Sequence, residues 1–368
     1  MKIALTHDHL FQIGGAEKVL LELTKIFPNS PIYTLIANPK WPEAKDLQII
    51  TSSLQKLPFS LNHFKWYLPL MPIAWEKFNF SKYDLVISSA SAFAKGIILT
   101  PKTFHICYCH SPTRYLWSDT HQYIDELKQP LLIKKFLPLI INYLRIWDFA
   151  AAQRVDKFIA NSKFVAKRIK KYYQRKATII YPPVEVDKYH LETEKDNYYI
   201  IVSRLRPYKR VDIAIKAFNQ LGLPLKIIGG GEEEQNLRKI AKKNIEFLGE
   251  ISEEKKIKIF SRALAFIHPQ EEDFGIAAVE AMAAGLPVIA FKSGGAEETV
   301  IDGETGKFFN EQCWEALADA IIRVNLKDYD PQRIRNHATK FSPDIFREQI
   351  SNFVTKSYQE YQGNILNI

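Results

Sequence analysis

The chain of 368 residues is 46% hydrophobic, which is normal for a globular protein, and its length suits two domains of about 150–200 residues. Its net charge of +9 favours anionic partners, namely nucleotides, phospholipid surfaces or nucleic acid. Only three cysteines are present, Cys107, Cys109 and Cys313, which excludes a disulfide framework and favours a reducing compartment.

In the first half, short β-branched runs alternate with helical stretches, which predicts a parallel sheet with crossover helices. Strands are expected at Lys2–Thr6, Ile32–Leu35, Asp84–Ser88, His105–Cys109 and Lys157–Ala160. A helix should begin near Gly14 and Gly15 and run to about Phe27. The first apolar run is too short for a signal peptide, and no run of about 18 apolar residues exists. We therefore expect a cytoplasmic protein, either soluble or peripheral to the inner face of the cytoplasmic membrane.

The second half repeats this alternation. Strands are expected at Tyr199–Ser203, Leu225–Gly229, Ala265–His268 and Val288–Phe291, and helices at Val211–Leu221, Glu232–Lys242, Glu253–Ser261 and Gly275–Ala284. Between the halves, the pair Pro182-Pro183 fixes an extended connection that cannot continue a helix. A boundary there divides the chain into α/β domains at residues 1–181 and 182–341, followed by a tail, 342–368, with a helical apolar rhythm.

The most informative stretch is Glu272-Asp273-Phe274-Gly275, which Glu280 follows five residues later. Phe274 and Gly275 mark the expected start of a helix, where unpaired N–H groups and the positive dipole end favour an anion. Glu280 lies roughly 7 Å further along that helix, at about 1.5 Å per residue. A phosphate at the helix start would have carboxylates on two sides that accept hydrogen bonds from sugar hydroxyls. A nucleoside-diphosphate sugar has this layout.

Two cations follow the first strand of the second half, at the edge where α/β sheets bind ligands. Arg204 can hold two phosphate oxygens at once, and Lys209 adds a compact charge. The alternative is a solvated basic loop. The pair Gly14-Gly15, between the first strand and the first helix, lets the backbone approach a ligand closely, with a simple tight turn as the alternative.

His110 follows the strand that contains Cys107 and Cys109. It is expected to donate to a sugar hydroxyl or a developing charge, and a hydrogen-bonded structural histidine is the alternative. Zinc is not expected, because one strand cannot direct these three side chains at one ion. Residues 7–9, His-Asp-His, are interpreted as the polar floor of the first strand's exit loop, and residues 328–330, Asp-Tyr-Asp, as a turn.

Gly230 is the centre of a triple glycine that follows the strand Leu225–Gly229. Three glutamates come directly after it and would repel a phosphate, so a turn near the nucleoside is expected rather than a phosphate cradle.

Two segments indicate a surface. Residues 54–78 mix six aromatic side chains with lysines, and residues 161–176 carry seven basic residues and no acidic one. An aromatic and basic mixture suits an anionic membrane interface. The alternatives are core packing for the aromatic side chains and a solvated face for the charges.

The Gly-Gly-Ala-Glu junction at 14–17, the Ser-Arg-Leu-Arg-Pro-Tyr-Lys loop at 203–209 and the E-x7-E element at 272–280 together resemble retaining glycosyltransferases of family 4 over nearly the whole chain. More narrowly, residues 85–89, 105–112 and 271–276 resemble WbaZ-type bacterial mannosyltransferases. The resemblance implies the GT-B fold, in which two Rossmann-like domains present parallel sheets to a central cleft. The first domain would take the acceptor, the second the nucleotide sugar, and the tail would cross back to the first domain.

The resemblance also implies site residues. The catalytic set is Arg204, Lys209, His110 and Glu272. The donor-binding set is Gly14, Gly15, Gly230, Phe274, Gly275, Ile276 and Glu280. In these roles Arg204 and Lys209 hold the diphosphate, Glu272 binds the donor sugar, Glu280 binds the ribose, and His110 faces the transferring sugar. No metal or other cofactor is expected.

The implied activity is transfer of a hexose with retained configuration, with GDP-mannose as the expected donor. The acceptor would be a lipid-linked oligosaccharide or a polysaccharide in O-antigen or exopolysaccharide biosynthesis, and an anionic membrane surface is a further candidate partner. Nucleic acid is not expected, because the sequence lacks a recognition helix, an RNP-type strand and a zinc finger. Three alternatives stay open: a UDP-sugar donor, a nucleotide-sugar epimerase of GT-B fold, and a non-catalytic protein that binds nucleotides or polyanions.

Overall fold

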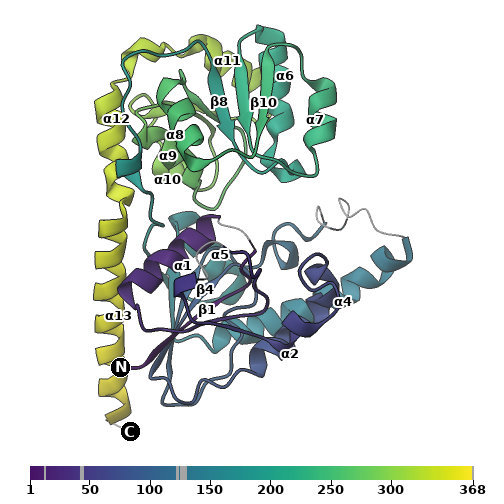
Figure 1. Cartoon of the computed structure of the whole chain (residues 1–368), viewed down its shortest axis with the longest axis vertical. Coiled ribbons are helices and arrows are strands. Elements are labelled where there is room, and N and C mark those ends of the chain that lie inside the picture. The colour runs from purple at the N-terminus through teal and green to yellow at the C-terminus, as the bar shows by residue number, and fades with distance from the viewer. Residues whose placement is uncertain (12–13, 42–44, 122–123, 125–130, 367–368) are drawn as a thin grey trace. The chain divides into compact units, whose positions relative to one another are not determined.

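The computed structural model describes the chain except for residues 12–13, 42–44, 122–123, 125–130 and 367–368 (Figure 1). It divides into two compact units. The first unit contains Met1–Tyr181 and Phe346–Ile368, and the second contains Pro182–Ile345. Each unit has a sheet covered by helices, and every strand pair in the described residues is parallel, which confirms the α/β prediction.

The sheet of the first unit has seven strands in the order β3-β2-β1-β4-β5-β6-β7. Their bounds are β1 Ile3–His7, β2 Ile32–Thr34, β3 Ile49–Thr51, β4 Leu85–Ala90, β5 Phe104–Cys109, β6 Lys157–Ala160 and β7 Ala177–Ile179. The five inner strands match the predicted ones. The two edge strands, β3 and β7, were not predicted, because each has three residues and is only partly buried, so neither forms a continuous apolar run.

The sheet of the second unit has six strands in the order β10-β9-β8-β11-β12-β13. Their bounds are β8 Tyr199–Val202, β9 Leu225–Ile228, β10 Ile245–Gly249, β11 Phe266–His268, β12 Val288–Phe291 and β13 Gly306–Phe309. Again the four inner strands were predicted and the two edges, β10 and β13, were not.

Helices connect the strands. In the first unit they are α1 Gly15–Ile26, α2 Met71–Glu76, α4 Leu131–Gln153 and α5 Lys163–Tyr173. In the second unit they are α6 Val211–Leu221, α7 Glu234–Ile240, α8 Glu253–Arg262, α9 Ile276–Ala283, α10 Ala296–Thr299, α11 Trp314–Arg323 and α12 Pro331–Ala338. The last helix, α13, runs from Pro343 to Leu366. The basic segment 161–176 forms α5, which buries Val165, Ile169 and Tyr173 and leaves its lysines exposed.

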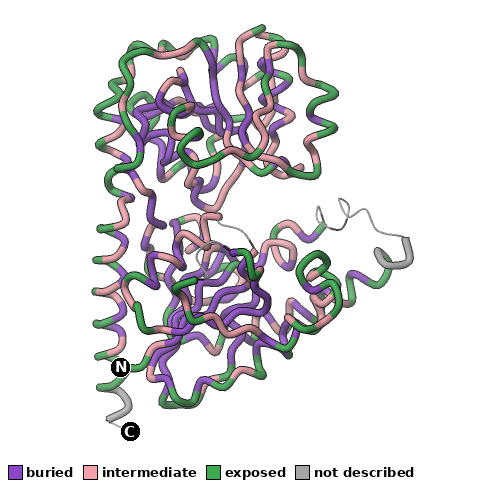
Figure 2. The backbone as a smooth tube through the Cα atoms, viewed as in Figure 1, coloured by how far each residue is buried: buried purple, intermediate pink, exposed green. Residues whose placement is uncertain are grey.

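Alternate residues of each inner strand of the first unit pack on opposite faces of the sheet. One face, with Leu85 and Ile87, packs against α1 and α13, whose Phe346 is buried. The other face, with Val86, packs against α2, α4 and α5, and Ile141 of α4 lies in that core. Figure 2 shows the buried residues concentrated on the strands and the helix faces next to them. This packing fixes the carboxyl ends of the strands, from which the candidate site residues extend.

Candidate functional site

The E-x7-E element begins in the loop between β11 and α9, which carries Glu272, and ends inside α9 at Glu280. Gly275 is the N-cap of α9 and has φ of 89°, a left-handed conformation that favours glycine. A Cβ at this position would also lie 3.4 Å from Cε1 of His268, the last residue of β11. The side chain of Phe274 is buried against Phe341, so Phe274 can offer a ligand only its backbone. Ile276 is the first residue of α9.

Lys209 and Glu272 meet. Lys209 closes the short 3-10 helix η6, Pro207–Lys209, after β8, and Glu272 follows β11, which is the neighbour of β8 in the sheet. The Lys209 ammonium contacts Oε1 of Glu272, and Gln270 Nε2 donates to the same oxygen at 2.8 Å. Burial raises the pKa of Glu272, but Lys209 and then His268 outweigh it and lower that pKa to about 2. The carboxylate is therefore ionised across the physiological range.

Arg204 lies in the same loop as Lys209 and is exposed. Its guanidinium forms no hydrogen bond or ion pair with any residue that the structure describes. The backbone of the triple glycine, residues 229–231, packs against the backbone of this loop. The N–H of Leu205 donates to the carbonyl of Gly230 at 2.9 Å, and a Cβ on Gly231 would lie 2.4 Å from the Leu205 carbonyl oxygen. The turn at Gly230 thus supports the cationic loop by backbone contact.

Glu280 lies in α9 and its side chain is 5% exposed. Oε2 of Glu280 is 3.0 Å from Nζ of Lys256, which in turn is 2.9 Å from Oε1 of Glu253. The sequence did not predict this partner, because Lys256 is on α8, 24 residues away, and nothing local links it to Glu280. The ribose-binding carboxylate of the prediction is thus a buried member of an ion-pair cluster.

A second glycine loop, which the sequence reasoning missed, packs on the Glu272 loop. A Cβ on Gly294 would lie 2.3 Å from the Glu272 carbonyl oxygen, and one on Gly295 would lie 2.4 Å from Cα of Phe274. The N–H of Gly295 donates to that Glu272 carbonyl at 2.8 Å. Only glycine permits such contact between backbones. The signal was present, because Ser293-Gly294-Gly295 follows the predicted strand at 288–291.

Two buried polar atoms beside Glu272 lack a partner. Nε2 of His268 and Oε1 of Gln270 form no hydrogen bond with the described part of the chain. Burial lowers the pKa of His268 below its ordinary value, Glu272 opposes this shift and Lys209 adds to it. Buried polar groups are usually satisfied. These two atoms therefore indicate a place where a ligand or water completes the site.

In the first unit, His110 belongs to a chain of polar side chains at the carboxyl ends of β1 and β4. Its Nε2 lies 2.8 Å from Oγ of Ser89, which lies 3.1 Å from Nδ1 of His7. On the other side of His7, Nε2 is 3.6 Å from Oε1 of Glu17, and Oε2 of Glu17 accepts from the N–H of Gly14 at 2.9 Å. His7, Ser89 and Glu17 were not predicted as partners of His110, because Ser89 and His7 are 82 residues apart.

Burial and charge shift the pKa values of the groups at the two ends of this chain of side chains. Burial raises the pKa of Glu17, but His7 outweighs it and lowers that pKa to about 2, so Glu17 is a carboxylate that can only accept hydrogen bonds. The Ser89 hydroxyl links the two imidazoles, and which of its neighbours donates to it is set by the tautomers of His7 and His110. Burial, and then the charge of His7, lowers the pKa of His110 to about 3. His110 is thus a neutral, oriented imidazole.

Asp8 holds the loop after β4, and Gly14 and Gly15 form the start of α1. Asp8 accepts hydrogen bonds from four backbone N–H groups of residues 91–94 at 2.7–2.8 Å, which holds the loop after β4. Gly14 is the N-cap of α1 and Gly15 is its first residue. The interpretation of residues 7–9 as the polar floor of the β1 exit therefore agrees with these contacts. Among the predicted residues of the second unit, Lys209 contacts Glu272, whereas Glu280 pairs with Lys256. Gly14, Gly15 and His110 belong to the first unit.

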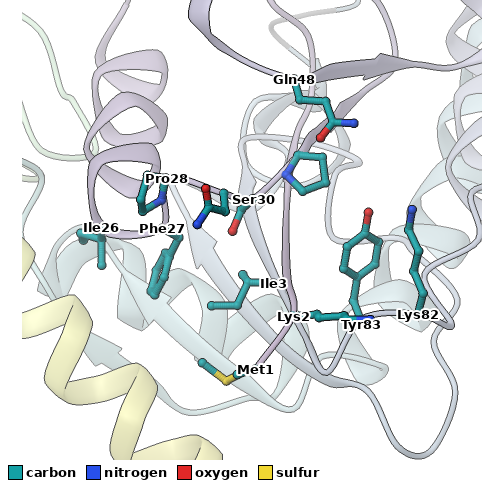
Figure 3. A pocket seen from close by; sticks show the side chains of 12 residues that line it. Met1, Lys2, Ile3, Ile26, Phe27, Pro28, Ser30, Gln48, Lys82 and Tyr83 are labelled. Atoms are coloured by element: carbon teal, nitrogen blue, oxygen red, sulfur yellow. The ribbon is translucent and has the colours of Figure 1, made fainter.

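A hollow of about 570 Å³ lies at the amino ends of the strands of the first sheet, opposite the carboxyl ends that carry the candidate site residues (Figure 3). It is lined by residues around the amino end of β1, including Ile3, Phe27, Gln48 and Tyr83. None of the predicted site residues lines it. Since α/β sheets bind ligands at the carboxyl ends of their strands, this hollow is not the candidate site.

Two further observations concern the described residues alone. Among them, no three His, Cys, Asp or Glu side chains are grouped so that they could hold a metal ion. No helix within the described ranges combines the length and the apolar character needed to cross a bilayer.

Two family models match the chain, Glycosyltransferase Family 4 over residues 13–188 and Glycosyl transferases group 1 over residues 185–341. An uncharacterized glycosyltransferase of Methanocaldococcus jannaschii is 30% identical over 217 residues, which are 57% of this chain and 61% of that protein. Alpha-1,3/1,6-mannosyltransferase ALG2 of Dictyostelium discoideum is 24% identical over 97% of this chain and 98% of its own length. O-antigen chain mannosyltransferase C of Escherichia coli is 28% identical, over 46% of this chain and 48% of its own.

Among solved structures, HepE of Anabaena in complex with UDP and glucose has a TM-score of 0.72 at 19% identity, covering 96% of this chain and 99% of that one. This likeness shows the fold and confirms the prediction of two parallel-sheet domains of GT-B type. Two glycosyltransferase models, each over a different half, together match residues 13–341, and the chain is a glycosyltransferase.

Proposed function

We propose that the protein transfers a hexose from a nucleotide sugar with retention of configuration. The observation that carries the proposal is the cluster at the carboxyl ends of β8 and β11, where Lys209 meets Glu272 while the nearby Arg204 guanidinium is exposed and has no described partner. A diphosphate needs cations, and a sugar needs a carboxylate that accepts from its hydroxyls. This cluster supplies both within one pair of loops.

In the proposed reaction, the bond between the anomeric carbon and the diphosphate oxygen breaks while the acceptor hydroxyl oxygen bonds to the same face of that carbon. The acceptor proton goes to the departing phosphate oxygen. Arg204 and Lys209 stabilise the charge that develops on the leaving group, in place of a metal ion. Glu272 orients the sugar through its hydroxyls, and His110, neutral at pH 7, acts as a hydrogen-bonding group rather than a cation.

The proposed donor is GDP-mannose. Two of the relatives reported above have names that state mannosyl transfer, and neither name states a nucleotide. The alternative is a UDP-sugar, because the structural neighbour HepE was solved with UDP and glucose. The proposed acceptor is a lipid-linked oligosaccharide or a polysaccharide precursor of O-antigen or exopolysaccharide. The protein would meet it at the inner face of the cytoplasmic membrane.

A thermal-shift series with GDP, UDP, ADP and their common sugars tests the proposal first, because a nucleotide that binds the folded state raises its melting temperature. Transfer is then measured with the nucleotide that gives the largest shift, with and without EDTA. Interconversion of the sugar nucleotide without glycan extension would favour the epimerase alternative. A flat response to every nucleotide would contradict the proposal.

Lys209→Ala is the decisive variant. We expect kcat to fall roughly a hundredfold to a thousandfold, which is the cost of losing one transition-state donor. Arg206→Ala is the matched control, because Arg206 lies in the same loop but its only described ion pair joins it to Glu232 at 3.7 Å. Equal activity of the Lys209→Ala variant and the wild type would refute the role of Lys209.

A further inference from the structure

Helix α4 is apolar on two sides. One side buries Ile141 and Leu144 in the core of the first unit. A second side exposes four large apolar residues, Phe136 at 55%, Leu139 at 67%, Tyr143 at 47% and Ile146 at 64%. Their spacing of three, four and three residues places them on one stripe of a helix with 3.6 residues per turn. A surface helix of a globular protein normally carries polar residues there, so the stripe requires another explanation.

A neighbouring segment extends this apolar surface. Helix α2 runs beside α4 (Figure 1), and Glu76 at its end accepts from Nε1 of Trp147 at 2.7 Å and from Arg154 at 3.2 Å. The chain before and within α2 exposes Phe59 at 65%, Trp66 at 63%, Leu70 at 44% and Ile73 at 48%. Of the aromatic residues predicted here as either core or interface, Trp75 is buried in the core whereas Phe59 and Trp66 are exposed.

The charges around this surface are positive. Lys56, Lys65, Lys77 and Lys135 are exposed in the two segments. The acidic residues of residues 54–77 and 135–153 are Glu76, paired with Arg154, and Asp148, which is fully buried against Lys95. A second copy of this chain would bring lysines against lysines. An anionic lipid surface has the opposite charge and accepts aromatic and aliphatic side chains at its interface.

We propose that the surface formed by Phe136, Leu139, Tyr143 and Ile146 of α4, with Phe59, Trp66, Leu70 and Ile73 beside it, lies on an anionic lipid bilayer. Its apolar side chains enter the interface and the lysines meet the lipid headgroups. The inference goes beyond glycosyl transfer and does not depend on it, because binding to lipid is measured without donor or acceptor.

The test uses the full chain and extruded vesicles of phosphatidylcholine, with and without about one third phosphatidylglycerol. We expect the wild type to float with the anionic vesicles, to bind neutral ones less, and to be released by high salt. The double variant Leu139→Ser/Ile146→Ser should lower the partition coefficient roughly tenfold or more, because binding scales with the apolar area that enters the interface.

Ile322→Ser is the matched control, since Ile322 is equally exposed, at 69%, but lies on α11 of the second unit. It should bind vesicles as the wild type does, and circular dichroism should show that both variants are folded. The proposal is overturned if the double variant binds as tightly as the wild type or if the wild type ignores anionic vesicles. It is also overturned if light scattering shows a dimer that the double variant converts to a monomer, which would make the stripe an interface between copies.

Discussion

Replacing Glu280 by Gln distinguishes two roles of this side chain, the ion pair with Lys256 and the proposed binding of the ribose. The substitution keeps the shape of the side chain and removes its charge, so Lys256 loses one ion partner. Breaking a buried pair costs about 3–5 kcal/mol when the remaining charge is uncompensated. Here Lys256 keeps Glu253 at 2.9 Å. The expected loss is therefore smaller, about 1–2 kcal/mol, or roughly 2–8 °C in melting temperature for a domain of this size.

If the Glu280 carboxylate also accepts from ribose hydroxyls, the same substitution weakens nucleotide binding. A hydrogen bond to a charged group contributes about 1.5–3 kcal/mol, so the dissociation constant should rise roughly tenfold to a hundredfold. Calorimetric titration with the nucleotide selected by thermal shift measures this value, and thermal melting measures stability in the same samples.

Glu253→Gln is the control, because it removes the other partner of Lys256 from a side chain that is 49% exposed. It should leave nucleotide affinity unchanged and cost little stability. Equal nucleotide affinity in Glu280→Gln and the wild type would show that Glu280 serves only to neutralise Lys256, and would refute its ribose-binding role.

Three further outcomes are expected. Ser89→Ala should lower activity and cost about 1–3 kcal/mol of stability, measured by steady-state kinetics and thermal melting, because His110 loses its hydroxyl partner at 2.8 Å. Gly295→Ala should lower the melting temperature and the nucleotide affinity together, because its Cβ would lie 2.4 Å from Cα of Phe274. Burial, reinforced by nearby cations, lowers the pKa of His105 to about 3, from 6.5. Between about pH 6.5 and pH 3 the unfolded state therefore binds a proton at His105 that the folded state does not, and His105 alone should lower the stability measured by urea unfolding by up to about 1.4 kcal/mol per pH unit toward acid.

Ser88→Ala is the matched control for Ser89→Ala. Ser88 is also fully buried on β4, but its hydroxyl lies 2.9 Å from Nε2 of His105, which is outside the His110 chain. It should reduce stability to a similar extent and leave kcat unchanged. Equal loss of activity in both serine variants would show that Ser89 does not support activity by orienting His110.

The inner strands of both sheets could be predicted because they are buried on both faces and read as continuous apolar runs. The edge strands β3, β7, β10 and β13 could not, since half-exposed strands of three to five residues leave a weak pattern. Helix α4 was not predicted either. Its apolar residues occupy two sides, and Pro138, a residue that normally argues against a helix, lies inside it, so no single helical stripe stands out from the sequence.

The candidate site was predictable where it rests on local sequence. Glu272 and Lys209 each stand in a short motif after a strand, and parallel strands bring such loops together. Partners that come from tertiary packing carry no local signal. Lys256 is on a different helix from Glu280, and Ser89 reaches His110 across two strands. These contacts arise only once the sheet register is known.

The contact between Lys209 and Glu272 gives the Lys209 ammonium an anionic partner within the protein. An incoming anion must compete with a carboxylate that is already in place, and the exchange is favourable only for a group that returns more charge than Glu272 contributes. Small monoanions meet this threshold poorly, whereas a diphosphate that also engages Arg204, as proposed above, meets it well. Under the proposed function, we therefore expect the salt bridge to favour a diphosphate over small monoanions.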